Sequence, residues 1–141
     1  MTPNGFAPIE ITRPFKTNEK LIEASKAWAD SYNRVENDIY DVTTNSLSID
    51  ALKNNAFYYR NVGETFNHRI RYTLQVIFGE NTCTLQFIVK EIYAKKSLTT
   101  LTVADFFAPD GRLKEDYEEV KPSLELTANN IVRSYINFIS E

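Results

Sequence analysis

The strongest constraint on the fold lies in residues 66–93, where two alternating runs flank a short polar turn. Even positions of residues 66–78 are almost all apolar or aromatic, and most odd positions are polar. In residues 83–89 the apolar residues again occupy every second position. A period of two predicts strands with one face on a core. The sequence therefore predicts an antiparallel hairpin closed by the glycine-containing turn 79–81, where Gly79 can adopt a positive φ at no steric cost.

Two segments have the 3.6-residue periodicity of amphipathic helices. The first is expected to begin after Thr17, whose hydroxyl can cap it, and to end near Arg34. Trp28 is expected to anchor this helix on the sheet. The second is expected to start near Pro122, because proline is tolerated in the first turn of a helix, and to run almost to the end of the chain.

Shorter patterns predict the remaining elements. Asn54 and Asn55 are expected to break or bulge a strand. The alternation changes parity after Val89, which predicts a β-bulge that bends the sheet. Residues 94–120 are too long for an unstructured connection inside a domain, so we expect short helical turns there. The predicted strands outside the hairpin are 9–13, 38–43, 46–52 and 56–60, and the predicted helical turns are 102–107 and 113–120.

The chain has 141 residues, which suits one domain with a sizeable core. Residues 1–8 contain two prolines and a glycine and are expected to form a flexible lead-in. Residues 9–141 are expected to form a single α+β domain. Because each long helix has one apolar stripe, we expect both helices on one face of an antiparallel sheet of about five strands.

A family resemblance rests on four features of the chain. These are the segment 9–17, the first helix with Trp28, the hairpin ending in Lys90-Glu91-Ile92-Tyr93, and the closing helix from Pro122. Together they resemble a bacterial domain family of unknown function with a TATA-binding-protein-like fold. The resemblance implies a curved antiparallel sheet in the order strand, helix, four strands, helix. It also implies an exported or envelope-associated protein in a periplasmic or surface setting, and it supplies no functional residues.

Chemistry-bearing residues are too few for a recognisable catalytic or metal site. His68 and Cys83 are the only histidine and cysteine, whereas a zinc site normally takes three or four nitrogen or sulfur ligands. Cys83 is expected to be a small buried residue, and His68 a strand residue near a sheet edge. No serine lies in a nucleophile-elbow pattern. The sequence therefore predicts no catalytic residue, no metal and no cofactor, and a protein that is not an enzyme.

Charge and hydropathy restrict the partners. The formal net charge is −3, and Arg69 and Arg71 are the only clustered arginines, so we predict no nucleic-acid binding. The acidic stretch 105–119 is expected to be a solvated face. No run is long and apolar enough to predict a transmembrane segment, and the first residues lack the features of a signal peptide.

The candidate binding residues are Phe57, Tyr58 and Tyr59. Neighbouring residues of a strand face opposite sides, so at least one of the three should point away from the others. Either it forms an exposed aromatic surface for an unknown protein or small ligand, or residues 94–120 fold over the cluster. Both outcomes remain open from the sequence.

The favoured function is a binding or accessory module of the bacterial envelope. One alternative is a small apolar-ligand carrier of helix-grip type, in which the final helix closes a cavity. The second alternative is an enzyme of unknown class. The predicted lining of the carrier cavity is Tyr72, Leu74, Phe87 and Tyr135.

Overall fold

A computed structural model describes residues 1–33, 36–94 and 100–141. The elements follow the predicted order of one strand, a helix, a run of strands and a closing helix, with one more short strand and two short 3₁₀ helices before the last helix. The elements are β1 (Ile9–Thr12), α1 (Asn18–Tyr32), β2 (Asn37–Tyr40), β3 (Ser46–Asn61), β4 (Glu64–Phe78), β5 (Thr82–Ala94), β6 (Thr100–Leu101), η1 (Val103–Phe106), η2 (Glu115–Tyr117) and α2 (Val120–Ser140).

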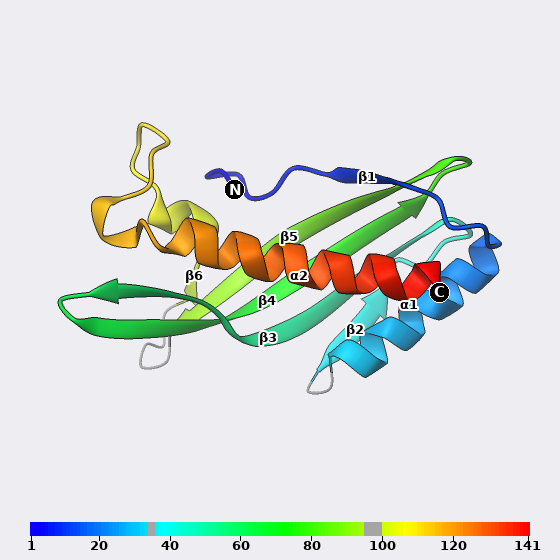
Figure 1. The fold of residues 1–141 in the computed structure, drawn as a ribbon, viewed down its shortest axis with the longest axis horizontal. Helices are drawn as coiled ribbons and strands as arrows, with labels where there is room; N and C mark the ends of the chain where they lie inside the picture. Colours follow the sequence, from blue (N-terminus) through cyan, green and yellow to red (C-terminus); the bar gives the residue numbers. More distant parts are fainter. Residues whose placement is uncertain (34–35, 95–99) are drawn as a thin grey trace.

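The six strands form one antiparallel sheet in the order β1-β5-β4-β3-β2, with β6 also paired to β5. Both long helices lie on the same face of this curved sheet (Figure 1). This confirms the predicted α+β fold. The prediction of about five strands missed β6, because a two-residue strand is too short to show an alternation.

The hairpin of β4 and β5 forms the centre of the sheet. On β4 the even-numbered residues from His68 to Phe78 are buried beneath the helices. Their partners on β5 include Leu85 and Phe87, which are also buried. The alternation in the sequence therefore identified the inner face of both strands correctly.

Glycine is required at the β4–β5 turn, but for a reason other than the predicted one. Gly79 does not have a positive φ. Its N–H donates to the carbonyl oxygen of Thr82 at 2.8 Å, and a Cβ at this position would lie 2.8 Å from the same oxygen. The turn therefore needs glycine because the backbone of Thr82 comes too close for any side chain.

Two irregularities bend the long strands. On β5, Lys90 has no partner, because Arg71 pairs with Glu91 and the next residue of β4 pairs with Val89. This confirms the predicted bulge. On β3, residues 54–56 stand opposite the single residue Arg69, so Asn54 and Asn55 form a bulge within one long strand, which is one of the two expected outcomes. The predicted strand 56–60 is therefore the continuation of β3.

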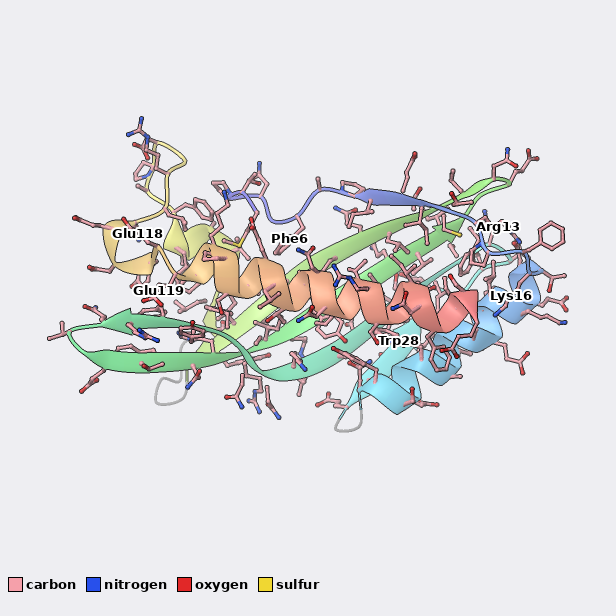
Figure 2. All side chains as sticks on the ribbon, in the orientation of Figure 1. Phe6, Arg13, Lys16, Trp28, Glu118 and Glu119 are labelled. Carbon is pink, nitrogen blue, oxygen red and sulfur yellow. The ribbon has the colours of Figure 1, made fainter. Side chains whose placement is uncertain are left out.

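Helix α1 begins as predicted, with the hydroxyl of Thr17 accepting a hydrogen bond from the N–H of Lys20. The buried indole of Trp28, however, contacts α2 (Figure 2). Its Nε1 donates to Ser134 Oγ at 3.1 Å, and its ring meets Tyr135 edge-on at 5.2 Å. Trp28 therefore joins the two helices to each other, in the same core as the inner face of the sheet.

The segment before α2 contains both predicted helical turns, as η1 and η2. Between them, the turn at 108–111 is closed by two backbone hydrogen bonds, and Gly111 has a φ of +86°. Residues 1–8 lie on the same face of the sheet as α2, where the ring of Phe6 meets Phe87 edge-on at 5.4 Å and the amino group of Met1 donates to Glu125 Oε1 at 2.8 Å (Figure 2).

Candidate functional site

The three candidate aromatic residues of β3 divide between the two faces of the sheet. Phe57 is buried and Tyr59 is half-buried on the inner face. Tyr58 faces the outer side and exposes 39% of its surface. Its backbone N–H donates to Ser123 Oγ of α2 at 3.1 Å, which holds this part of β3 against the helix. Of the three residues, only Tyr58 offers its ring to a partner.

Phe57 and Tyr59 belong to a stack of four rings that crosses β3 and β4. The His68 ring lies nearly parallel to Phe57, with centroids 4.9 Å apart, and to Tyr59, at 5.4 Å. Tyr59 stacks in turn on Phe66 at 5.2 Å. His68 is only 4% exposed, and β4 is flanked by β3 and β5. The expectation that His68 lies near a sheet edge is therefore wrong.

The two 3₁₀ helices cover this stack. Phe106 of η1 meets Phe57 edge-on at 5.7 Å and the His68 ring at 6.3 Å. Tyr117 of η2 meets Tyr59 at 5.0 Å and Phe106 at 5.0 Å. Part of the 94–120 segment therefore folds over Phe57 and Tyr59, whereas Tyr58 stays exposed on the opposite face.

The environment of His68 favours the neutral form of its imidazole. Burial lowers its pKa below the usual value of 6.5, and the nearby carbonyl oxygen of Tyr93 offsets this only in part. Nδ1 lies 3.3 Å from that oxygen, which assigns the proton to Nδ1 as the donor. Nε2 is buried and has no hydrogen-bond partner among the described residues. Protonation would place a charge on an unpartnered atom between aromatic rings.

We expect the protein to lose stability as the pH falls below about 6.5. Below that value the unfolded chain binds a proton at His68, whereas the folded state, in which the pKa of His68 is lower, does not. The free energy of unfolding therefore decreases as the pH falls from the unfolded pKa to the folded pKa. The two pH values to compare are 7.0 and 5.5, which lie on either side of the usual histidine pKa. Urea denaturation at these two pH values measures the loss.

Because His68 is the only histidine, His68→Phe is a direct control for this pH dependence. The variant keeps a flat ring in the stack and cannot titrate. Its unfolding free energy should change much less than that of the wild type between pH 7.0 and 5.5. An equal change in both proteins would show that His68 is not responsible.

The turn that joins β3 to β4 has an unfavourable residue at its tip. Asn61 pairs with Glu64, so the loop consists of Val62 and Gly63. Both have positive φ, +51° and +77°, which defines a type I′ turn. Glycine adopts this conformation freely, whereas a β-branched side chain is strained in it. Val62 is nevertheless 95% exposed and gains no burial in return.

Val62→Asn is expected to raise the free energy of unfolding by about 1 kcal/mol, because asparagine tolerates the left-handed region that valine resists. Thermal and urea denaturation measure the gain. Val42→Asn is a suitable control, since Val42 is also exposed but does not have a positive φ. An unchanged or lowered stability in Val62→Asn would contradict the assignment of strain to this turn.

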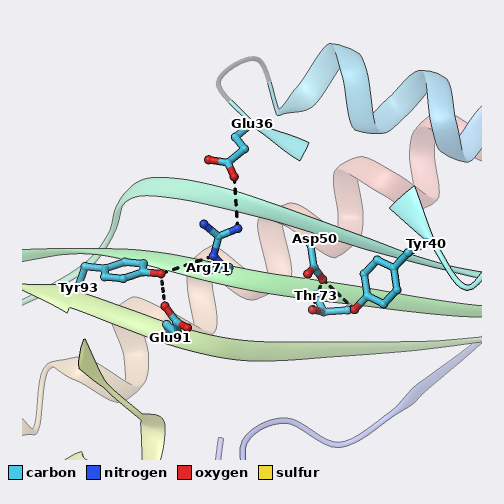
Figure 3. A network of polar contacts seen from close by, with 7 residues as sticks. All are labelled: Glu36, Tyr40, Asp50, Arg71, Thr73, Glu91 and Tyr93. Atoms are coloured by element: carbon cyan, nitrogen blue, oxygen red, sulfur yellow. Dashed lines mark hydrogen bonds and ion pairs between the residues drawn. The ribbon is translucent and has the colours of Figure 1, made fainter. Parts of the chain in front are cut away.

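The outer face of the sheet carries two polar clusters (Figure 3). In the first, the carboxylate of Asp50 accepts hydrogen bonds from the hydroxyls of Tyr40, at 3.0 Å, and Thr73. This satisfies the hydroxyl of Thr73, which is buried although it lies on the outer face. The first cluster thus links β2, β3 and β4. Its hydroxyl groups donate to Asp50 and are therefore not free to donate to a ligand.

The second cluster lies closer to the β3–β4 turn and surrounds Tyr93. The Arg71 guanidinium lies 3.5 Å from both the Tyr93 hydroxyl and Glu36 Oε1, and these contacts raise its pKa. The Tyr93 hydroxyl also donates to Glu91. On the other side, the Arg69 guanidinium lies over the Tyr93 ring, 5.1 Å from its centroid. Two guanidinium groups therefore converge on one tyrosine.

The predicted lining of the carrier cavity is filled core. Tyr72, Leu74 and Tyr135 are completely buried, and Phe87 is 4% exposed. A cavity large enough for a ligand would leave exposed area on the side chains that line it. Instead the Tyr72 and Phe87 rings stack at 5.2 Å, and the Tyr135 hydroxyl lies 2.7 Å from Ser25 Oγ. These contacts count against a carrier that uses this lining.

Among the described residues, no three histidine, cysteine or carboxylate side chains come together as metal ligands. Cys83 is buried, and burial raises the pKa of its thiol, which disfavours the reactive thiolate. In the same part of the chain, none of the helices has the length and apolar composition needed to span a bilayer.

Sequence reasoning missed two features of this region. The strained turn had a signal, since Val62-Gly63 stands between two strand patterns in the place where Asn-Gly is preferred. The convergence of Arg69 and Arg71 on Tyr93 had a weaker one. The sequence places both arginines on the polar face of β4. Which residues of β5 lie opposite them depends on the bulge at Lys90.

Comparisons with known proteins identify the fold. Neither a family model nor a curated protein sequence matches the chain. A TBP-like protein from Parabacteroides distasonis ATCC 8503 has a similar structure, with a TM-score of 0.65 and 11% identity over 96% of this chain and 92% of that one. A DUF4468 family protein from Bacteroides ovatus ATCC 8483 has a TM-score of 0.59 and 8% identity over 94% of this chain and 80% of that one. The chain therefore has a TATA-binding-protein-like fold, as the family resemblance implied, and it shares this fold with bacterial proteins of the genera Bacteroides and Parabacteroides.

Proposed function

We propose that this protein is a non-enzymatic binding module and that its partner surface is the closed end of the β3–β4 hairpin, residues 57–68, here called the arm. The carrying observation is that exposed apolar side chains gather on the arm. Tyr58 exposes 39% of its surface on the outer face of the arm, Val62 exposes 95% at its tip, and Phe66 exposes 38% on its inner face beside Tyr59. Aromatic and aliphatic side chains left open to water in one region often mark a partner surface.

The arm is well supported for such a role. It projects at the end of the molecule away from the C-terminus (Figure 1). Phe106 and Tyr117 brace its inner face, and hydrogen bonds from Thr127 to the Ala56 carbonyl and from the Tyr58 N–H to Ser123 fix its base to α2. A braced arm loses little conformational entropy on binding. The strained backbone at Val62 is not offset by burial of the side chain, which favours a functional role for valine at this position.

The non-enzymatic part of the proposal is supported by burial. His68 and Cys83, the side chains best suited to proton transfer or nucleophilic attack, are both buried beneath the helix-covered face of the sheet. Neither related structure is described by an enzymatic activity.

The proposal includes an envelope setting, which the family resemblance implies. Fractionation of cells that express the untagged full-length protein would test it. Recovery with periplasmic or envelope markers is expected. Recovery only with a cytoplasmic marker would contradict the setting without affecting the role of the arm.

Site-specific photo-cross-linking in the native cell tests the arm. A benzophenone amino acid at position 62 is expected to give a discrete cross-linked product. The same group at position 126 is the matched control, because Leu126 is also an exposed apolar residue, 62% accessible, but lies on α2. Products at position 126 and none at position 62 would refute the arm as the partner surface.

Tyr58→Ser and Tyr59→Ser separate binding from folding. Tyr58→Ser should leave the melting temperature within a few degrees of wild type and suppress the cross-link from position 62. Tyr59→Ser should lower stability markedly, because it removes a ring that contacts Phe66, His68 and Tyr117. Large destabilisation by Tyr58→Ser would instead place Tyr58 in the core.

A further inference from the structure

We propose that the outer face of the arm and its base bind an extended, acidic segment of a partner protein. The surface consists of Tyr58, Arg60, Arg69, Arg71 and Tyr93, here called the outer strip. This inference rests on the proposed function, since it names the chemistry of the partner that the arm would bind.

The residues of the outer strip share one face of the sheet. On β4, Arg69 and Arg71 are two positions apart and therefore point to the same side. Tyr58 and Arg60 pair with Asn67 and Thr65, which have the same parity, and Tyr93 pairs with Arg69. On β4 the even-numbered residues, such as His68, point to the opposite face, which the helices cover. The strip therefore runs along the strands from the turn towards the centre of the sheet.

Two of its guanidinium groups lie on aromatic rings. Arg69 lies 5.1 Å from the centroid of Tyr93, and Arg60 lies 5.9 Å from that of Tyr58. Among the residues that the structure describes, neither arginine has a carboxylate within ion-pair distance. A guanidinium stacked on a ring keeps its N–H groups pointing outwards in a planar fork. That fork matches a carboxylate, which can accept two parallel hydrogen bonds.

The spacing of the cations favours an extended ligand. Alternate residues of a strand are about 7 Å apart, which is the spacing of the backbone positions of Arg69 and Arg71 on β4. Their guanidinium groups lie at the ring and at the hydroxyl of Tyr93. An extended peptide presents its own alternate side chains at the same interval. Acidic residues at every second position can therefore meet successive arginines of the strip, while an apolar residue contacts the exposed ring of Tyr58.

The charges around the strip favour a peptide over a nucleic acid. Glu36 and Glu91 lie beside Arg71 and Tyr93, so a continuous phosphate backbone would meet two carboxylates at the base of the strip. The chain as a whole carries a formal charge of −3, and the acidic residues Glu118 and Glu119 lie at the same end of the molecule as the arm (Figure 2). A peptide with a few separated carboxylates avoids most of this repulsion.

Fluorescence anisotropy with a labelled ten-residue peptide of alternating glutamate and threonine tests the proposal. The full-length protein is expected to bind this probe, and binding should weaken as salt rises from 50 to 300 mM. Arg69→Gln should reduce affinity about tenfold or more, because it removes the charge and the fork. Arg133→Gln is the matched control, since Arg133 is exposed on α2, and it should bind like wild type.

Two further probes make the outcome decisive. A peptide with glutamine in place of glutamate should not bind, and a ten-residue oligothymidylate should bind more weakly than the acidic peptide. The inference is overturned if the acidic peptide does not bind, if Arg69→Gln binds as well as wild type, or if the oligothymidylate binds more tightly. A retained cross-link from position 62 would then show that only the acidic chemistry is wrong, whereas its loss as well would refute the binding arm itself.

Discussion

Replacing Phe106 by alanine is expected to lower the free energy of unfolding by about 3–5 kcal/mol. Phe106 is almost fully buried, and its ring contacts Phe57, Tyr59, His68 and Tyr117. Truncation removes the transfer free energy of the phenyl group and leaves a cavity against four rings. Among the described contacts, η1 and η2 pack aromatic rings against the arm only at this stack. We therefore expect the arm to loosen before the rest of the sheet. Urea denaturation measures the global loss.

Phe15→Ala is the matched control, because it makes the same chemical change at a fully exposed phenylalanine. It should change stability by no more than about 0.5 kcal/mol. Amide hydrogen exchange adds a local readout. In Phe106→Ala, protection should fall more in residues 57–68 than in the β4–β5 pairing near Phe78. A stability loss below about 1 kcal/mol would show that η1 does not brace the arm.

Trp28→Ala is expected to have an effect of similar size, about 3–5 kcal/mol, at the other end of the core. The indole is buried between Tyr32, on which it stacks at 5.2 Å, and Tyr135, which it meets edge-on. It also donates to Ser134. Its removal takes away the largest side chain that joins α1 to α2, so α1 should lose hydrogen-exchange protection before the sheet does.

Ser134→Ala separates the hydrogen bond of Trp28 from its packing. This variant keeps the ring in place and removes only the acceptor, so the expected loss is about 1–2 kcal/mol. Equal losses in Trp28→Ala and Ser134→Ala would mean that the hydrogen bond, and not the packing of the indole, holds the helices together.

Much of the fold followed from local patterns. The period-two runs identified the buried parity of β4 and β5, and the parity change after Val89 located the bulge at Lys90. Thr17 and Pro122 marked the starts of the helices. Such features depend on residues within a few positions of each other, so they can be found without knowledge of the rest of the chain.

Local sequence patterns predicted only part of the candidate site. The sequence showed that Phe57, Tyr58 and Tyr59 could not all face one side. Which of them would be covered depended on Phe106 and Tyr117, about fifty residues further along, and no local pattern links these positions. The same holds for Trp28, whose partner surface on α2 is about a hundred residues away.

Local periodicity was therefore sufficient for the strands, the helices and the inner face of the sheet, because side-chain direction in each element is set by backbone geometry. It predicted that β4 and β5 pair as an antiparallel hairpin with one face on the core, and the structure agrees. Tertiary packing decided that His68 is buried in an aromatic stack, that Tyr58 stays exposed, and that Arg69 and Arg71 meet at Tyr93. These outcomes depend on bulges that reset the pairing register and on contacts between distant segments, and neither is encoded in a short stretch of sequence.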